Sequence, residues 1–345
     1  MNSLYRPILK QAWFHTWRHK FLWLFGFFAA WLGTSGEYEL FIRSFDRINE
    51  KGSLLININQ FIATTGVFSA NTVNNLKMLA TTRPLDLVWL ILLFLVIILA
   101  GLFIVWAVVT AQGSLISSIR KVAKNQPANF QDGLDAGLAK FWPILWLNLI
   151  YRLIVFILFL ALGVIFAYFF ANVFVSSQAN AGLGSFILFL VGFIIFLPLV
   201  FVVSFIIRYA ACYAVIKNFR FKEAIRQGIL LFAKNWLISL ELSLILLFLH
   251  IAVAIAIILL VIVVGAPLIL LLSMLYAMSF AFGFYTVVMI TIFILLAVII
   301  LAVSLFSTYL WSCWTLLFLQ LTEKGGTSKL VRLANNIPGI KRQSI

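Results

Sequence analysis

The sequence predicts an all-α membrane protein with six transmembrane helices, from its composition and from the length of its apolar runs. Hydrophobic residues make up 64% of the 345 residues, charged residues only 10%, and the mean hydropathy is +1.12. A globular core could not bury so much apolar surface. A hydrocarbon core of about 30 Å needs about 20 apolar residues in a helix, so apolar runs of this length indicate transmembrane helices.

Six spans follow along the chain, and two regions allow alternatives. The spans are 20–40, 85–111, 143–175, 185–216, 237–264 and 284–321. The first run is short, but Trp23 and Trp31 within it favour an anchored span over a cleaved signal peptide. Residues 265–283 are apolar and no polar turn separates them from the last span. We interpret them as an interfacial or re-entrant segment packed against protein, because a seventh span would put the basic C-terminus outside.

The basic residues predict the orientation of these spans. The net charge is +15, with 25 Lys and Arg against 10 Asp and Glu. Most basic residues fall in four segments on one side, and the other side has them only in the loop 41–84. The positive-inside rule then places both termini in the cytoplasm, so one membrane domain, 1–325, precedes a basic tail, 326–345. Because the charges flank apolar runs, we expect anionic membrane lipids as partners and no nucleic acid.

An internal repeat connects the cytoplasmic segments to the spans. Its two clear copies are Phe130-Gln-Asp-Gly-Leu134 with Ala139-Lys140-Phe141-Trp142, and Phe221-Lys-Glu-Ala-Ile225 with Ala233-Lys234-Asn235-Trp236. Residues 12–21 form a weaker third copy. Apolar residues recur at helical spacing, which predicts an amphipathic interfacial helix, an aromatic anchor and a helical hairpin in each unit. Three units give six spans with both termini inside.

The repeat assigns two kinds of residue to the interface. The predicted anchors are Trp17, Trp142 and Trp236, and the predicted lipid-facing basic residues are Lys140, Lys222, Arg226 and Lys234. Periodicity alone leaves an equal alternative, a connecting helix packed on the ends of the bundle. Gly133 and Gly137 have the spacing typical of close helix contact.

This pattern resembles the six-helix membrane domain fused to some bacterial glycerophosphodiester phosphodiesterases, and its stand-alone relatives. The resemblance is carried by Phe221-Lys-Glu-Ala-Ile225, by Asn235-Trp236 entering a span, and by Thr315-Leu-Leu-Phe-Leu-Gln-Leu-Thr-Glu-Lys-Gly325 leaving the last one. In that family the catalytic domain is separate and soluble, and we expect none in this chain. The resemblance therefore implies a protein of the bacterial inner membrane and no esterase activity.

A few polar residues inside the spans form a candidate site. Arg152 and Arg208 lie at similar depths in two spans of one hairpin, and Glu241 lies near the start of the next span. Each arginine has a polar residue four positions earlier, Asn148 and Ser204, on its own helical face. Snorkelling or a structural ion pair would explain these charges. The alternative is a cytoplasm-facing pocket for an anionic headgroup, because the guanidinium group binds phosphate in a bidentate way.

The sequence offers no catalytic residues, no metal site and no cofactor site that we can assign. It has no phosphate-binding loop, no zinc-protease motif and no nucleophile elbow. His15 and His19 have the spacing of a metal pair but lack a further ligand, so a basic interfacial face is favoured. Cys212 and Cys313 fall in apolar runs, which argues against a disulfide framework.

Three functional hypotheses remain. The leading one is a non-enzymatic scaffold or lipid-interacting protein whose cationic amphipathic helices contact the cytoplasmic leaflet. The second is a transporter or channel for an anionic or lipid-like substrate, suggested by repeats around a possible axis. The third is an assembly factor for other membrane proteins.

Overall fold

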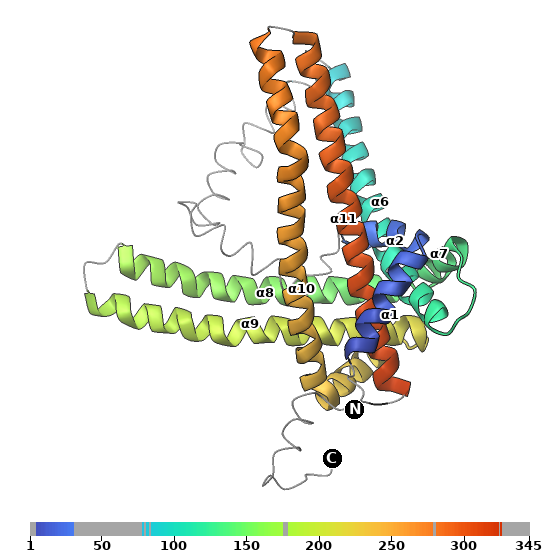
Figure 1. The fold of residues 1–345 in the computed structure, drawn as a ribbon. Helices are drawn as coiled ribbons and strands as arrows, with labels where there is room; N and C mark the ends of the chain where they lie inside the picture. The colour runs from blue at the N-terminus through green and yellow to red at the C-terminus, as the bar shows by residue number, and fades with distance from the viewer. Residues whose placement is uncertain are drawn as a thin grey trace. The chain divides into compact units, whose positions relative to one another are not determined.

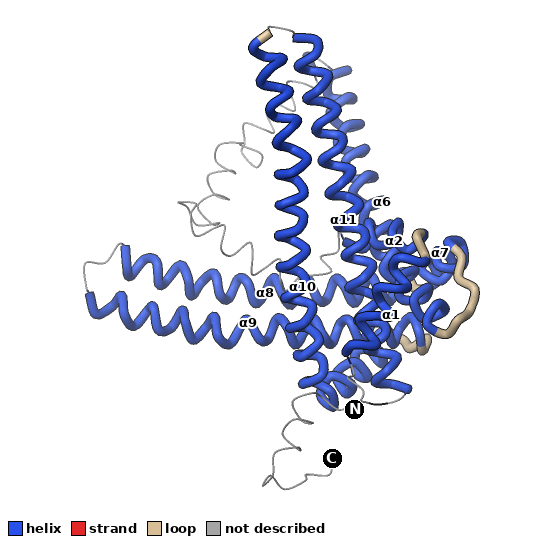
Figure 2. Tube along the Cα trace, in the orientation of Figure 1, coloured by secondary structure: helices blue, strands red, loops and turns tan. Residues whose placement is uncertain are grey.

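The part of the chain that the structure, a computed structural model, describes is almost entirely helical, and it comprises residues 5–30, 78, 81–82, 84–174, 179–278, 281–323 and 325. Its helices are α1 (Tyr5–Arg18), α2 (Phe21–Ala30), α6 (Pro84–Ala123), α7 (Phe130–Ala139), α8 (Phe141–Phe174), α9 (Ala179–Ile216), α10 (Phe221–Ala277) and α11 (Ala281–Glu323) (Figure 1). The described residues include no strand (Figure 2). The predicted all-α class is confirmed.

Five of these helices, α6, α8, α9, α10 and α11, are long and apolar enough to cross a membrane. Each of the five later predicted spans coincides with one of them, except that the last residue of span 143–175 lies outside the described residues. The protein therefore belongs to the class of multi-pass helical membrane proteins. Of the first predicted span, 20–40, the structure describes the ten-residue apolar helix α2. The rest of that span, most of the loop 41–84 and the tail 326–345 lie outside the described residues.

The re-entrant segment predicted for residues 265–283 is wrong. Helix α10 continues through Pro267 to Ala277, and α11 begins at Ala281. Proline removes one backbone donor, but the surrounding apolar residues satisfy their backbone groups only by staying helical in lipid. The apolar stretch therefore lengthens both helices of a hairpin instead of folding back into it.

The predicted amphipathic segments are separated from the apolar helices by breaks. Lys140, between α7 and α8, has φ −111° and ψ 14°, and Asn235 within α10 has φ −128° and ψ 30°. A third break at His19 and Lys20 separates α1 from α2. Two of the breaks directly precede the predicted anchors Trp142 and Trp236. These positions fit the proposed repeat, which stays a prediction.

Three of the long helices end with the same backbone conformation. Asn125, Asn218 and Gly325 each lie two residues after the end of α6, α9 or α11, and their φ angles are 53°, 58° and 68°. A left-handed residue after a helix end is a common C-terminal cap, and Asn and Gly tolerate it best. In α6 the cap is closed by a hydrogen bond from the Gln126 N–H to the Lys121 carbonyl at 2.9 Å.

The described chain divides into two compact units, and the first contains the hydrophobic core. We call the parts of this unit that bear the core the base: residues 5–30, 108–152, 201–246 and 304–323. Within the base the ends of α6, α9 and α11 are buried on every side, over residues 108–116, 207–212 and 307–319. These stretches bury small polar residues such as Ser114, Ser312 and Thr315 among the apolar ones, and small residues of this kind are typical of helix–helix contacts in membrane proteins.

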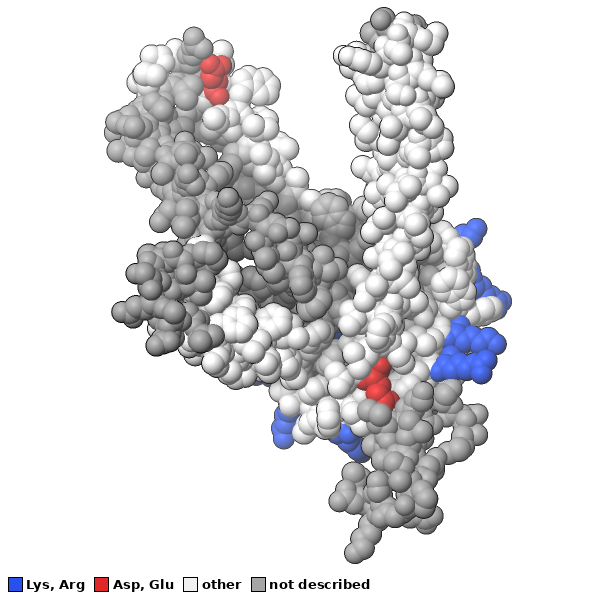
Figure 3. Space-filling model, turned by 60° about the vertical axis from the view of Figure 1, so that its left-hand side comes forward, with Lys and Arg blue, Asp and Glu red and all other residues white. Residues whose placement is uncertain are grey.

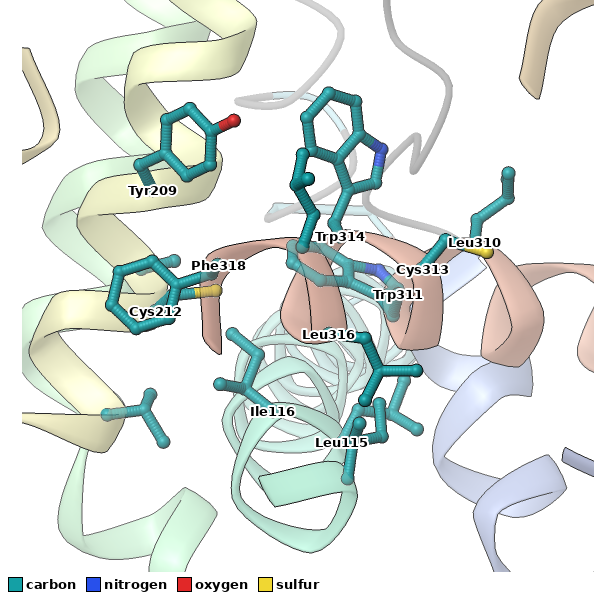
Figure 4. Close-up of a cluster of buried hydrophobic side chains, with 14 of the residues drawn as sticks. Leu115, Ile116, Tyr209, Cys212, Leu310, Trp311, Cys313, Trp314, Leu316 and Phe318 are labelled. Atoms are coloured by element: carbon teal, nitrogen blue, oxygen red, sulfur yellow. The ribbon is translucent and has the colours of Figure 1, made fainter. Parts of the chain in front are cut away.

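The contacts between these three helix ends are made by large side chains. Figure 4 shows Leu115 and Ile116 of α6, Tyr209 and Cys212 of α9, and Leu310, Trp311, Cys313, Trp314, Leu316 and Phe318 of α11 gathered in one cluster. The Phe205 ring lies 5.3 Å from the Trp314 ring between centroids. The centre of the base is thus filled by side chains from three helices that are distant in sequence.

The second unit comprises residues 37–107 and 153–200. Within it α8 and α9 pack through aromatic rings, with Phe169 and Phe189 stacked at a centroid distance of 5.6 Å. A glycine at 192 lets α9 approach Ile165 of α8 closely. The apolar side chains of residues 85–106 in α6 are almost all exposed, and this length is about 33 Å at 1.5 Å per residue. It matches the hydrocarbon thickness.

Candidate functional site

The basic residues at the end of α6 are used inside the protein. The Nη1 atom of Arg120 donates a hydrogen bond at 3.0 Å to the carbonyl of Ile216, which is the last residue of α9. Lys121 pairs with Asp132 of α7 at 3.3 Å, and Lys124 pairs with Glu323 of α11 at 3.0 Å. A cation at a helix C-terminus is stabilising, whereas half-exposed pairs contribute about 0–1 kcal/mol each. These three cations join helices, a role that their sequence positions alone did not reveal.

The first segment of α10, residues 221–234, has one face on protein and one face outside. Ala224, Gly228 and Leu231 are buried, and a Cβ on Gly228 would lie 2.9 Å from the Ile206 carbonyl of α9. Of the apolar residues on this segment, Ile229 and Leu230 are exposed. The segment therefore packs against α9 and also presents apolar side chains outward. Contact of its outer face with lipid stays a prediction.

The outward face of this segment is cationic. Five basic side chains are exposed on this segment and on the linker just before it, and we call them the α10 cationic face: Lys217, Arg220, Lys222, Arg226 and Lys234. Glu223 is the single acidic residue between positions 217 and 234. No ion pair joins these five cations to an acidic residue within the described part of the chain. In Figure 3, Lys and Arg gather around the lower part of the α10–α11 pair, whose upper length shows neither charge.

Helix α7 presents a different surface, although its sequence predicts a similar role. It carries Asp132 and Asp135 and no basic residue, while Lys140 lies half-buried at its C-terminal cap. A Cβ on Gly137 would lie 2.3 Å from Ser114 Oγ of α6, and one on Gly133 would lie 2.5 Å from Ser118 Oγ. The predicted close contact of the two glycines is confirmed. An equally cationic character for all three amphipathic helices is wrong, because the exposed charges of α7 are acidic.

The three predicted aromatic anchors are all exposed. The exposed fractions are 46% for Trp17, 65% for Trp142 and 54% for Trp236. Exposed indole rings at the ends of apolar helices are typical of membrane interfaces. Their assignment as lipid anchors stays a prediction.

The polar residues inside the spans lie in different environments. Arg208 is 8% exposed and its guanidinium carbon lies 4.8 Å above the Trp314 ring, while Ser204 is also buried. Arg152 is exposed. A buried cation over an indole is stabilised by the ring face. The partner Trp314 comes from α11, too far along the chain for any local pattern to indicate it.

The remaining members of the predicted cluster bind other helices. Asn148 donates from Nδ2 to Gln112 Oε1 of α6 at 2.7 Å. Glu241 accepts a hydrogen bond from the Tyr5 hydroxyl of α1. The grouping of Arg152, Arg208 and Glu241 around an anion stays a prediction. The hydrogen bonds of Asn148 to Gln112 and of Tyr5 to Glu241 were not part of that prediction.

His15 of α1 and His19, which directly follows α1, both have a pKa below the usual 6.5 because of partial burial. Burial lowers the pKa of His15 from its usual 6.5, and the nearby His19 and Arg18 lower it further. Among the described residues no group of three or more His, Cys, Asp or Glu side chains is arranged to hold a metal ion. His15 therefore stays neutral to lower pH than a solvent-exposed histidine.

Comparison with known proteins gave no relative. No protein-family model, no curated protein and no solved structure matches this chain. The resemblance to the membrane domain of the glycerophosphodiester phosphodiesterases stays a prediction.

Proposed function

We propose that this protein is a non-enzymatic, lipid-interacting scaffold of the bacterial inner membrane, with both termini in the cytoplasm. Its long apolar helices cross the bilayer, and the α10 cationic face contacts anionic lipid headgroups of the cytoplasmic leaflet. The single observation that carries the proposal is this face: five exposed cations, one acid, and a buried opposite side that fixes its orientation. Each juxtamembrane Lys or Arg is attracted to anionic lipid by about 1 kcal/mol.

The packing of the base favours a scaffold over a transporter. Tyr209, Phe205 and Phe318 are among the largest fully buried side chains, and they lie where α9 and α11 meet. A substrate path along this centre would have to displace close-packed rings, and dense cores resist such displacement. A transporter for anionic or lipid-like substrates remains the alternative, with Arg208 as the residue it would use.

The test compares two triple variants that remove the same charge from the full-length protein. Lys222→Gln/Arg226→Gln/Lys234→Gln removes cations of the α10 face, and Arg120→Gln/Lys121→Gln/Lys124→Gln removes the cations used inside the base. Both are placed in nanodiscs of mixed anionic and neutral phospholipids, and the lipids retained after mild detergent extraction are measured by mass spectrometry. We expect the first variant to lose anionic lipid without losing thermal stability, and the second to lose stability.

Two results would contradict the proposal. Equal anionic lipid in the first variant and in the unaltered protein would mean that the α10 cationic face does not bind headgroups. Unchanged retention in high salt would contradict it also, because exposed charges are screened over about 10 Å at 0.1 M.

A further inference from the structure

Helix α1 has a buried face and an exposed aromatic face. Tyr5, Ile8, Ala12 and Thr16 recur at helical spacing and are buried in the base. On the other side Trp13, Phe14 and Trp17 are exposed, and we call these three residues the α1 aromatic face. Three large exposed aromatic side chains within five residues form an apolar patch of the kind that marks a contact surface.

The aromatic face is held in place by its neighbours. The Trp17 ring lies 5.6 Å from that of Trp13 and 5.7 Å from that of Trp23 of α2, between centroids. The Trp13 ring lies 6.1 Å from that of Tyr309 of α11. Trp23 Nε1 donates to the Thr16 carbonyl at 2.7 Å, which fixes the turn between α1 and α2. Rings from three helices thus form one preorganised array.

Charged residues beside the array suggest the chemistry of its partner. Arg6, Lys10 and Arg18 of α1 are exposed, and α1 has no acidic residue. Arg18 lies over the Phe14 ring at 5.4 Å. The indole rings of Trp13 and Trp17, with cations alongside, suit the headgroup and glycerol region of a phospholipid leaflet, because an indole has an apolar body and a polar N–H, and the Phe14 ring adds apolar surface.

The position of the array along α11 supports the same partner. Tyr309 belongs to the buried stretch 307–319, whereas Leu301 and Val303, two turns earlier, are exposed. The array therefore lies where α11 changes from a protein-covered helix to an exposed apolar one. Helix α2 lies beside this part of α11, because the Thr308 hydroxyl donates to the Leu22 carbonyl at 3.1 Å, and α2 is apolar from Phe21 to Ala30. The α1 aromatic face therefore lies next to the point where the exposed apolar part of α11 begins.

We infer that the α1 aromatic face is a docking surface for the phospholipid interface, and that it binds by insertion of its rings. The inference rests on the proposed function in that both place the base beside the cytoplasmic leaflet. It differs in its chemistry: the α10 cationic face needs anionic lipid, whereas aromatic insertion also holds in neutral lipid. Burial of apolar ring surface gains about 25 cal/mol per Å² and needs no charge on the lipid.

The experiment measures the depth of this face in a neutral bilayer. The full-length Phe14→Cys variant carries a spin label, and Gln131→Cys on the exposed side of α7 is the matched control. The native Cys212 and Cys313 are buried and escape labelling, which the unaltered protein checks. In nanodiscs of phosphatidylcholine, we expect the label at position 14 to collide several-fold less with a water-soluble nickel complex than the label at 131. Its collisions with oxygen should stay frequent.

Each outcome decides the inference. Equal nickel access at 14 and 131 would place the face in water and overturn it. Protection from both nickel and oxygen would mean that protein covers the face, for example a second copy, and would overturn it too. Protection of the label at position 14 from nickel only when anionic lipid is added would mean that electrostatic attraction, and not aromatic insertion, holds the face at the membrane, and would overturn the inference as well. Loss of anionic lipid in the α10 triple variant is measured separately, so either idea can fail while the other stands.

Discussion

Helix α7 and the first segment of α10 are built alike and present opposite charges outward. Each follows a left-handed cap, Asn125 or Asn218, and each places a glycine against the end of the preceding long helix. Each ends at a non-helical residue, Lys140 or Asn235. The cap, the glycine and the break recur in both segments and determine how each segment packs. The exposed charges differ, being acidic in α7 and basic in the first segment of α10. The comparison teaches that surface charge and packing can be altered separately in this protein.

The largest expected effect tests the shared packing. Gly137→Ala would bring a Cβ to 2.3 Å from Ser114 Oγ and 2.4 Å from the Thr110 carbonyl, and Gly228→Ala would bring one to 2.9 Å from the Ile206 carbonyl. Overpacking costs about 1–3 kcal/mol, so we expect Gly137→Ala near the upper end and Gly228→Ala near the lower. Thermal unfolding of the purified full-length protein measures both.

A third glycine supplies the control for these two. Gly101 has no described atom within 4 Å of an added Cβ, so Gly101→Ala should stabilise by up to about 1 kcal/mol through helix propensity. If Gly137→Ala unfolds at the same temperature as Gly101→Ala, the close contact between α7 and α6 does not exist.

An intermediate effect concerns the polar contacts that follow each break. Asn148 of α8 binds the buried Gln112 of α6, and Ser239 of α10 lies 2.6 Å from the Tyr209 hydroxyl of α9. Asn148→Leu leaves Gln112 without this partner, which costs about 1–3 kcal/mol, whereas Tyr209→Phe costs about 1 kcal/mol. The difference arises because Ser239 keeps its bond to the Asn235 carbonyl. Chemical denaturation in detergent measures both.

A double variant separates the hydrogen bond from the packing. In Asn148→Leu/Gln112→Leu neither polar group is left unpaired, and replacing both partners by apolar groups is nearly neutral. We expect this variant to regain most of the stability that Asn148→Leu loses. A double variant less stable than the single one would mean that shape, not hydrogen bonding, matters at this contact.

The smallest expected effect is a pH dependence that belongs to α1 alone. The pKa of His15 is lowered in the folded protein from 6.5, so the unfolded chain binds more protons in the interval between the two values. The stability contribution is complete above pH 6.5 and is lost as the pH falls through this interval. Neither α7 nor the first segment of α10 contains a histidine.

This pH dependence can be assigned to its residue. The melting temperature should fall between pH 7.5 and pH 5.5, and the decrease should be smaller in His15→Gln, which has no titrating group at this position. An identical decrease in both proteins would assign the effect to other groups.

Much of the fold could be predicted because its signals are local. Run length and the absence of charge identify the five long helices, and the tryptophans at 142 and 236 mark the positions where helices break. The continuation of α10 through Pro267 was missed, because the orientation of the C-terminus was used to choose between a re-entrant segment and a seventh span, whereas an apolar helix also tolerates proline and can simply continue. The acidic surface of α7 could have been predicted from Asp132 and Asp135, but the prediction considered only the flanking Lys140.

The sequence predicted which residues belong to the candidate site, but it did not predict which residues they contact. The exposure of Lys222, Arg226 and Lys234 follows from their spacing along one helix. The partners Trp314 for Arg208 and Tyr5 for Glu241 come from helices far along the chain. Contacts of this kind depend on tertiary packing, which helical periodicity does not encode.

The sequence by itself determined that the chain is helical, that it spans a membrane and that its cations flank the spans. Only the tertiary structure decided which helices pack against each apolar run. In α11 residues 282–303 are largely exposed, whereas residues 307–319 are buried and include the polar Ser307, Thr308, Ser312 and Thr315. Hydrophobic periodicity distinguishes two faces of a helix only when one face is polar. Small polar residues such as those of 307–319 are typical of helix–helix contacts, but they do not identify the partner, and the distant helices α6 and α9 become the partners of α11 only through packing.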